Sequence, residues 1–288
     1  MIAIVGIVIT FVMVFGGYLI AGGKFGIILG SLPFEMMMIG GAALGAFVLS
    51  NAMDDIKHTV KDIGKVFKGE HWKPQDYQDL LCLLFALIRV ARNNPMDVEA
   101  HIEEPAESAI FQKYPKILSN KTAVDLICDT MRAGIMNYDD PHQVEEVLEK
   151  RLEAIHHHNE HSSHALQQMA DGLPALGIVA AVLGVIKTMG SIDQPPEVLG
   201  KLIGGALVGT FLGVFLAYGI VGPMATKVKT VVNNDHHFYL LIREVLVANL
   251  HNHAPDICVE VGRQNTPGGM RPSFGDLSEA LREVKAAG

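Results

Sequence analysis

Charged residues are scarce in this sequence. Asp, Glu, Lys and Arg make up 19% of the 288 residues, whereas hydrophobic residues make up 49%. A soluble protein of this length normally carries more charge, about a quarter of its residues. The net charge of −8 at pH 7 argues against a nucleic-acid partner, because such partners bind basic surfaces. The composition therefore points away from an ordinary soluble domain and toward the lipid bilayer.

Cysteine is rare as well. The three cysteines, Cys82, Cys128 and Cys258, are far apart and form no C-x-x-C pair. This pattern predicts reduced thiols rather than a disulfide framework or a zinc site. No catalytic residues, metal ligands or cofactor are expected, and the chain is not predicted to be an enzyme.

Four long runs contain no charged residue. They cover Ile2 to Ala21, Met36 to Met53, Gly172 to Ile186 and Leu202 to Thr226. Each supplies most of the ~20 residues that a membrane-spanning helix needs, and the third is long enough if Lys187 extends its side chain to the interface. The first run lacks a basic leader region, so it is expected to stay as a span.

Lysine and arginine predict the orientation. Thirteen of the 23 lie between the second and third runs, and seven follow the fourth. By the positive-inside rule, these parts and both termini lie in the cytoplasm. The short loops near Gly22–Ser31 and Ser191–Gly200 then face outside. The fold class is an all-α integral membrane protein with four transmembrane helices and a large helical cytoplasmic domain.

The predicted organisation has four segments. Residues 1–51 form a transmembrane hairpin, 52–171 a helical cytoplasmic domain, and 172–223 a second hairpin. Residues 224–288 form a cytoplasmic C-terminal helix followed by a loosely ordered tail, because the last part is polar and rich in Gly and Pro.

Helix starts in the cytoplasmic part are indicated by proline. Pro74 fits a proline in the first turn, Asn94–Pro95 and Asp140–Pro141 each fit a cap followed by such a proline, and Ser119 or Asn120 fits a further cap. The helix after Asp140 carries an apolar stripe that predicts core packing. This stripe consists of Val144, Val147, Leu148, Leu152 and Ile155.

Small residues recur in the fourth run. Gly205, Gly209, Gly213 and Ala217 are spaced four apart. Such spacing lets helix backbones approach closely in lipid. It indicates either tight packing within one chain or packing between copies around a central partner or pore.

No ionisable residue lies in the middle of any of these four runs, and Glu35, Asp171, Lys187 and Lys201 are expected near span ends. A proton relay needs a titratable group at depth. The chain alone is therefore not expected to carry protons by that route, although it could line a path whose acid comes from another chain. Thr210 could bond a partner carboxylate there, or it could bond its own helix.

Three other features have two interpretations each. Pro174 and Pro223 could simply start or kink a helix, or they could be hinges. The charged zone that includes Arg92 and Glu99 could be solvated surface or a docking surface. Residues 157–161 spell the H-x-x-E-H zinc protease pattern, but a solvated interfacial face is favoured because no third ligand is indicated.

Several motifs together resemble the MotA family, the larger stator subunits of the bacterial flagellar motor. They are Asp171–Gly184, Val208–Gly213, Leu216–Gly219 with Pro223, Pro33–Met36, Ile102–Pro105, Tyr114–Pro115 and Arg271–Phe274. The resemblance extends over essentially the whole chain.

The resemblance implies a function. Copies of the chain, a pentamer in this family, would surround two helices of a MotB-like, single-span subunit anchored to peptidoglycan. That partner would supply the proton-binding Asp, and the homo-oligomer would push the rotor protein FliG. The location would be the bacterial inner membrane.

The resemblance also assigns residues. Pro174 and Pro223 match the hinge or gating prolines, Thr210 the channel-lining hydroxyl, and Ala181 the channel-lining position where sodium-driven relatives carry Thr. Arg92 and Glu99 match the two rotor-contact charges, although the stretch between them is one residue shorter than usual.

Two other classes of membrane protein are alternatives. TolQ and ExbB proteins usually have three spans, so four spans disfavour them. A solute or metal transporter would require a polar site at the midplane, and none is visible in the sequence.

Overall fold

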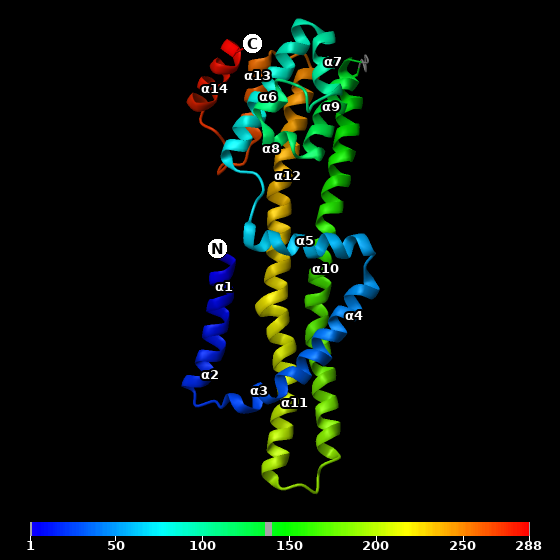
Figure 1. The fold of residues 1–288 in the computed structure, drawn as a ribbon, viewed down its shortest axis with the longest axis vertical. Coiled ribbons are helices and arrows are strands. Elements are labelled where there is room, and N and C mark those ends of the chain that lie inside the picture. The colour runs from blue at the N-terminus through cyan, green and yellow to red at the C-terminus, as the bar shows by residue number, and fades with distance from the viewer. Residues whose placement is uncertain (1, 136–139, 288) are drawn as a thin grey trace. The chain divides into compact units, whose positions relative to one another are not determined.

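The computed structural model describes residues 2–135 and 140–287, and these residues form helices and turns without a β-strand (Figure 1). The chain divides into two compact units. Unit 1 contains Met1–Gly69 and Asn159–Val231, and unit 2 contains Glu70–His158 and Val232–Gly288.

These units differ from the four predicted segments. Residues 52–69, 159–171 and 224–231 belong to unit 1, together with the apolar runs. The reason is that α10 (Pro141–Met189) and α12 (Gly222–Leu250) continue through the predicted boundaries. The compact units therefore do not mark where the membrane begins and ends along these helices, and the four segments stay a prediction.

Four helices in the described residues are long and apolar enough to cross a membrane, as predicted. The first two cover Ile2–Ile20 and Phe25–Ser50, and the other two lie in Pro141–Met189 and Pro196–Leu250. The first of these helices consists of α1 (Ile2–Phe11), η1 (Val12–Gly16) and α2 (Gly17–Ile20). The second consists of α3 (Phe25–Glu35), η2 (Met36–Gly40) and α4 (Gly41–Ser50).

The second helix corrects one expectation. It begins at Phe25, so the predicted loop over Gly22–Ser31 shortens to a turn at residues 21–24. Glu35 therefore lies inside this helix and not at a span end. The sequence pattern placed it at the end because an ionised side chain is costly in lipid, whereas in the structure it is buried against other helices of unit 1.

The core of unit 1 is small. It is built from buried residues of the second helix, α10, α11 (Pro196–Leu216) and η4 (Ala217–Val221). Figure 1 shows α3 lying across α11, against which it packs. Many other large apolar side chains remain exposed, as a lipid environment permits. The buried core residues are Ile39, Ala43, Leu173, Ala180, Leu212 and Ala217.

Unit 1 also contains an amphipathic helix, α5 (Met53–Lys68). Its buried face consists of Thr59, Asp62 and Val66, and Lys65 forms an ion pair with Asp62 at 2.9 Å.

Unit 2 is organised around α6 (Pro74–Asn93), whose residues 80–85 are all buried. The predicted caps are confirmed: Asn94 accepts from the Met96 N–H at the start of α7 (Pro95–Glu103), and Asn120 caps α9 (Lys121–Ile135). The remaining short elements are η3 (Phe111–Lys113) and α8 (Pro115–Leu118).

The stripe at the start of α10 is confirmed in part. Val144, Leu148 and Leu152 are buried in the core of unit 2, whereas Val147 is 66% exposed. Val147 directly precedes Leu148, so it lies to one side of the buried face, and treating it as core was wrong.

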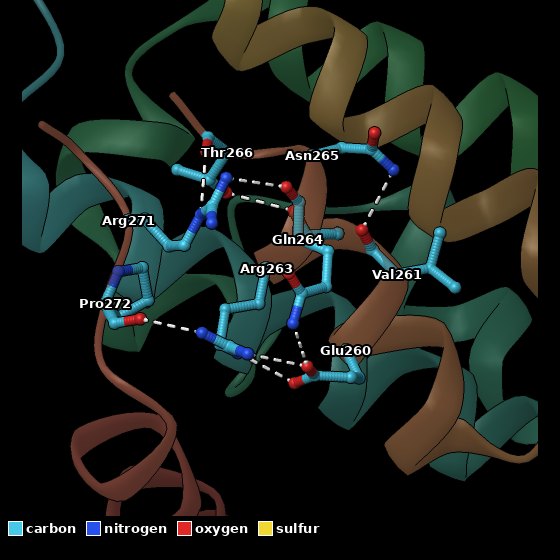
Figure 2. A network of polar contacts seen from close by, with 9 residues as sticks. Glu260, Val261, Arg263, Gln264, Asn265, Thr266, Arg271 and Pro272 are labelled. Atoms are coloured by element: carbon cyan, nitrogen blue, oxygen red, sulfur yellow. Dashed lines mark hydrogen bonds and ion pairs between the residues drawn. The ribbon is translucent and has the colours of Figure 1, made fainter. Parts of the chain in front are cut away.

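The C-terminal tail is ordered, contrary to expectation. It forms α13 (Pro255–Asn265) and α14 (Phe274–Ala287), and both pack on α6. The segment between them is held by arginine, as Figure 2 shows: Arg263 pairs with Glu260 at 2.7 Å and donates to the Pro272 carbonyl, while Arg271 donates to the Gln264 and Thr266 carbonyls. Charge-assisted bonds to backbone carbonyls thus fix a segment whose composition indicated disorder.

The three cysteines are buried in unit 2 and unpaired, in agreement with the predicted reduced thiols. Burial raises the pKa of the Cys82 and Cys128 thiols to about 12.

Candidate functional site

The glycine face of α11 packs against α10. A Cβ at Gly213 would lie 2.6 Å from the Leu173 carbonyl oxygen and 2.8 Å from the Gly177 Cα. A Cβ at Gly177 would in turn lie 2.8 Å from the Gly209 carbonyl oxygen. The two backbones therefore touch, and only residues without a side chain fit there.

The same face also meets the second helix. A Cβ at Gly209 would lie 2.6 Å from Glu35 Oε2, and one at Gly205 would lie 2.8 Å from Ser31 Oγ. The structure thus shows these glycines packing within one chain, which was the first of the two interpretations of the four-residue spacing. Ala217 is also buried inside unit 1.

Glu35 is the carboxylate that sequence reasoning misplaced. Its side chain is buried, and Oε2 has no hydrogen-bond partner among the described residues. A buried, unsatisfied carboxylate in a span is costly, which is typical of residues retained for function. The signal that could have found it is the apolar stretch Phe25–Phe34 before it, which lengthens the second span.

A cavity of about 420 Å³ lies beside this carboxylate. Its lining joins the second helix to the facing parts of α10 and α11. The polar groups of the lining are Ser31, Glu35, Lys187 and Lys201. Groups of both charge signs therefore border one space in unit 1.

Thr210 is half-buried on α11, beside Gly209. Thr10, Thr188, Thr226 and Thr230 each donate to the carbonyl four residues back in their own helices. Within the described residues, the Thr210 hydroxyl makes no such bond, so the interpretation that it only bonds its own helix does not describe this structure.

Ala181 lies near the same contact. Its backbone nitrogen would be 3.2 Å from a Cβ at Gly209, and the residue is half-buried. The structure therefore brings Ala181, Gly209 and Glu35 together.

The two prolines occupy different helix positions. Pro174 lies inside α10, and Pro223 is the second residue of α12, directly after the π-helical turn η4. A proline has no N–H to donate to the carbonyl four residues earlier in a helix. Before Pro223, the wider π-helical turn η4 accommodates this missing hydrogen bond.

Arg92 and Glu99 lie in unit 2 and are both exposed. The Arg92 guanidinium donates to Asn249 Oδ1 and to the His253 carbonyl at the turn after α12. Glu99 makes no hydrogen bond or ion pair with the described residues. Arg92 is thus anchored within its own unit, which its position in the sequence did not indicate.

The fold and this site define a helical membrane protein with four apolar helices, three of which meet closely at glycines, and a second helical unit. Two family models match the chain: Motility protein A N-terminal over residues 4–95, and the MotA/TolQ/ExbB proton channel family over residues 120–239.

Relatives match over nearly the full length. Motility protein A of Escherichia coli is 37% identical over 286 residues, which cover 99% of this chain and 96% of the relative. Chemotaxis protein LafT of Vibrio parahaemolyticus is 33% identical over 279 residues, covering 96% and 97%. The chain therefore belongs to the motility protein A (MotA) family of the MotA/TolQ/ExbB proton channel proteins.

Solved structures share the fold. C. jejuni MotAB matches with a TM-score of 0.74 at 19% identity, covering 94% of this chain and 98% of that chain. The flagellar MotAB stator complex from Bacillus subtilis matches with a TM-score of 0.68 at 20% identity, covering 89% and 92%.

Proposed function

We propose that this chain is the torque-generating subunit of a flagellar stator in the bacterial inner membrane. It would form a pentamer around a MotB-like, single-span subunit anchored to peptidoglycan and would push the rotor protein FliG. The observation that carries the proposal is the 37% identity to a motility protein A over 99% of the chain.

The geometry supports a channel that a partner completes. Thr210, with its hydroxyl unpartnered among the described residues, is free to bond a partner carboxylate or a water beside it. Ala181 lies on α10 against Gly209, which precedes Thr210 in the sequence, and it keeps this contact small and apolar. We infer that these two residues line the path of the proton and that the partner's Asp carries it.

Glu35 is a carboxyl group of this chain itself that lies near the proposed path. Its buried Oε2 lies against Gly209, and the residue is part of the lining of the 420 Å³ cavity. We infer that it binds a proton or a cation beside the path, because an unpaired buried carboxylate is costly as an anion and either partner neutralises it.

In unit 2, Glu99 provides an exposed negative charge that has no ion-pair partner among the described residues, which suits an electrostatic contact with a rotor. Arg92 would contribute a positive charge held in a fixed position by the turn after α12. Pro174 and Pro223 would act as hinges in the two helices that run into unit 2.

A deletion strain tests the whole proposal. Cells that lack this chain should assemble flagella but not swim, and the wild-type gene should restore swimming. Glu35→Gln, which keeps the shape and removes the ionisable carboxyl group, should restore the protein level but only part of the swimming speed. If the deletion strain swims normally, the chain is not a required stator subunit.

Purified chain in liposomes tests the partner's role separately. The chain alone should give no more proton flux than empty liposomes, and flux should appear only with the Asp-bearing partner. Flux from the chain alone would place the proton carrier on this chain, with Glu35 as the first candidate.

The topology is tested by labelling cysteines from the periplasm. A cysteine at Asp193 should react and one at Gly268 should not, if both termini are cytoplasmic. The native cysteines are buried and should not interfere. Periplasmic labelling at position 268 would reverse the predicted orientation.

A further inference from the structure

Three potential metal ligands converge in unit 2, beside the turn after α12 that also holds Arg92. They are His142 and Glu145 on α10 and His251 in the turn after α12. One ligand atom from each residue lies within 4.8 Å of the other two. The Nδ1 of His142 is 3.9 Å from a Glu145 carboxylate oxygen, and the His142 and His251 rings are 5.4 Å apart.

Local structure holds each of these residues in place. His142 is in the first turn of α10, where its N–H bonds the Asp140 side chain at 3.0 Å, and Glu145 lies one turn further on the same face. His251 begins a tight turn in which its N–H and those of Asn252 and His253 bond backbone carbonyls of α12. In Figure 1 the first turn of α10 and the last turn of α12 lie at the same end of unit 2.

The donor set has a defined chemistry. Two imidazoles and one carboxylate are the protein ligands of open zinc centres, with bond lengths of about 2.0–2.2 Å. Two ligand atoms on one tetrahedral ion are then roughly 3.4 Å apart, so the observed atoms must converge by no more than about 1.5 Å. His142 and His251 are exposed, so small side-chain rotations can supply this movement.

The electrostatics of the two helix ends act in opposite directions. The N-terminus of α10 carries partial positive charge, which disfavours a cation, but Asp140 and Glu145 lie there as well. The C-terminal carbonyls of α12 favour a cation beside His251. Arg92 is a nearby positive charge, and its guanidinium donates to the His253 carbonyl and to Asn249, while the His253 ring lies 6.4 Å from that of His251.

We propose that His142, Glu145 and His251 form a binding site for a divalent transition-metal ion such as Zn²⁺, with water in the remaining position. The ion ties the start of α10 to the turn after α12, two elements more than a hundred residues apart in the sequence. Because the folded state gathers the ligands and the unfolded chain does not, binding stabilises unit 2. This proposal is independent of the proposed stator function.

Unit 2 contains its own reporter of unfolding. Trp72 is the sole tryptophan of the chain, is 1% exposed, and stacks on Phe238 at 3.7 Å. Its fluorescence therefore follows the unfolding of unit 2. The experiment uses the purified full chain, stripped of metal with a chelator, and measures the midpoint of thermal unfolding with and without Zn²⁺.

Zn²⁺ should raise this midpoint in the wild type. His251→Ala and His142→Ala should each lose most of that shift and bind Zn²⁺ at least about tenfold more weakly by calorimetry, because one of three ligands is gone. Glu145→Gln, which keeps the shape of the side chain, should weaken binding as well. The midpoints of these variants without metal should stay close to that of the wild type, since the side chains changed are largely exposed.

The histidines at positions 156–164 provide the matched control, because they lie on the same helix and could bind Zn²⁺ themselves. The double variant His158→Ala/His161→Ala should keep the full Zn²⁺ shift. The proposal is overturned if the wild type shows no shift, if His251→Ala keeps it, or if the control variant loses it.

Discussion

The contact between α10 and α11 gives the sharpest test of the fold. In Gly213→Ala the new Cβ would lie 2.6 Å from the Leu173 carbonyl oxygen and 2.8 Å from the Gly177 Cα. Carbon atoms normally approach no closer than about 3.5 Å, so the helices must move apart by roughly 0.7–1 Å. Backbone atoms cannot rotate away as side chains do, so the cost should lie at the upper end of the usual range for overpacking, about 2–3 kcal/mol.

Gly45→Ala is the matched control, since a Cβ at Gly45 meets nothing within 4 Å. Both substitutions add the same methyl group to a spanning helix, so the difference between them isolates the clash. Thermal unfolding in detergent, followed by circular dichroism, should place the Gly213→Ala midpoint about 5 °C or more below that of Gly45→Ala. Equal midpoints for the two variants would refute the close contact. A low midpoint for Gly45→Ala would instead show that Gly45 faces another chain in the assembly.

Three further predictions concern other parts of the chain. Thr210→Val, nearly equal in volume, should leave protein levels and partner co-purification intact but slow swimming, because a hydroxyl that could bond a partner carboxylate is lost. Normal swimming speed would show that Thr210 does not line the proton path. Glu99→Lys should reduce swimming at normal protein levels because it reverses an exposed charge. Arg92→Glu should reduce swimming and also lower the midpoint of thermal unfolding, because Arg92 holds the turn after α12. Equal midpoints for Arg92→Glu and the wild type would mean that this anchor contributes no stability. The thiols of Cys82 and Cys128 should resist a thiolate-specific reagent at pH 8 until the protein is denatured, because their pKa is raised to about 12. The ordinary thiol pKa is 9.0, so the stability that this shift contributes is complete below pH 9 and is lost as the pH rises from 9 toward 12. The free energy of unfolding measured against pH should fall over this range.

Much of the fold could be predicted because its signals are local. A cap followed by proline, as at Asn94–Pro95 and Asp140–Pro141, satisfies the first N–H groups of a helix with neighbouring atoms alone. An uncharged run long enough to cross a bilayer likewise needs no distant partner to be recognised. These features gave the four spans and the helix starts of unit 2.

The candidate site could be predicted only in part. The four-residue spacing of Gly205, Gly209 and Gly213 showed that a helix approaches closely, because only glycine and alanine permit that approach. The spacing did not show which helix approaches. The packing partners proved to be α10 and the second helix of the same chain.

The sequence by itself determined the class of this protein, the number of its spans and most helix starts, because each depends on hydrophobicity or hydrogen bonding within a few residues. Only the tertiary structure decided that Glu35 is buried inside a span, that Arg92 is anchored by the turn after α12, and that the C-terminal tail is ordered. Each of these depends on contacts between residues far apart in the chain, and a buried carboxylate or an anchored guanidinium has the same local sequence as an exposed one.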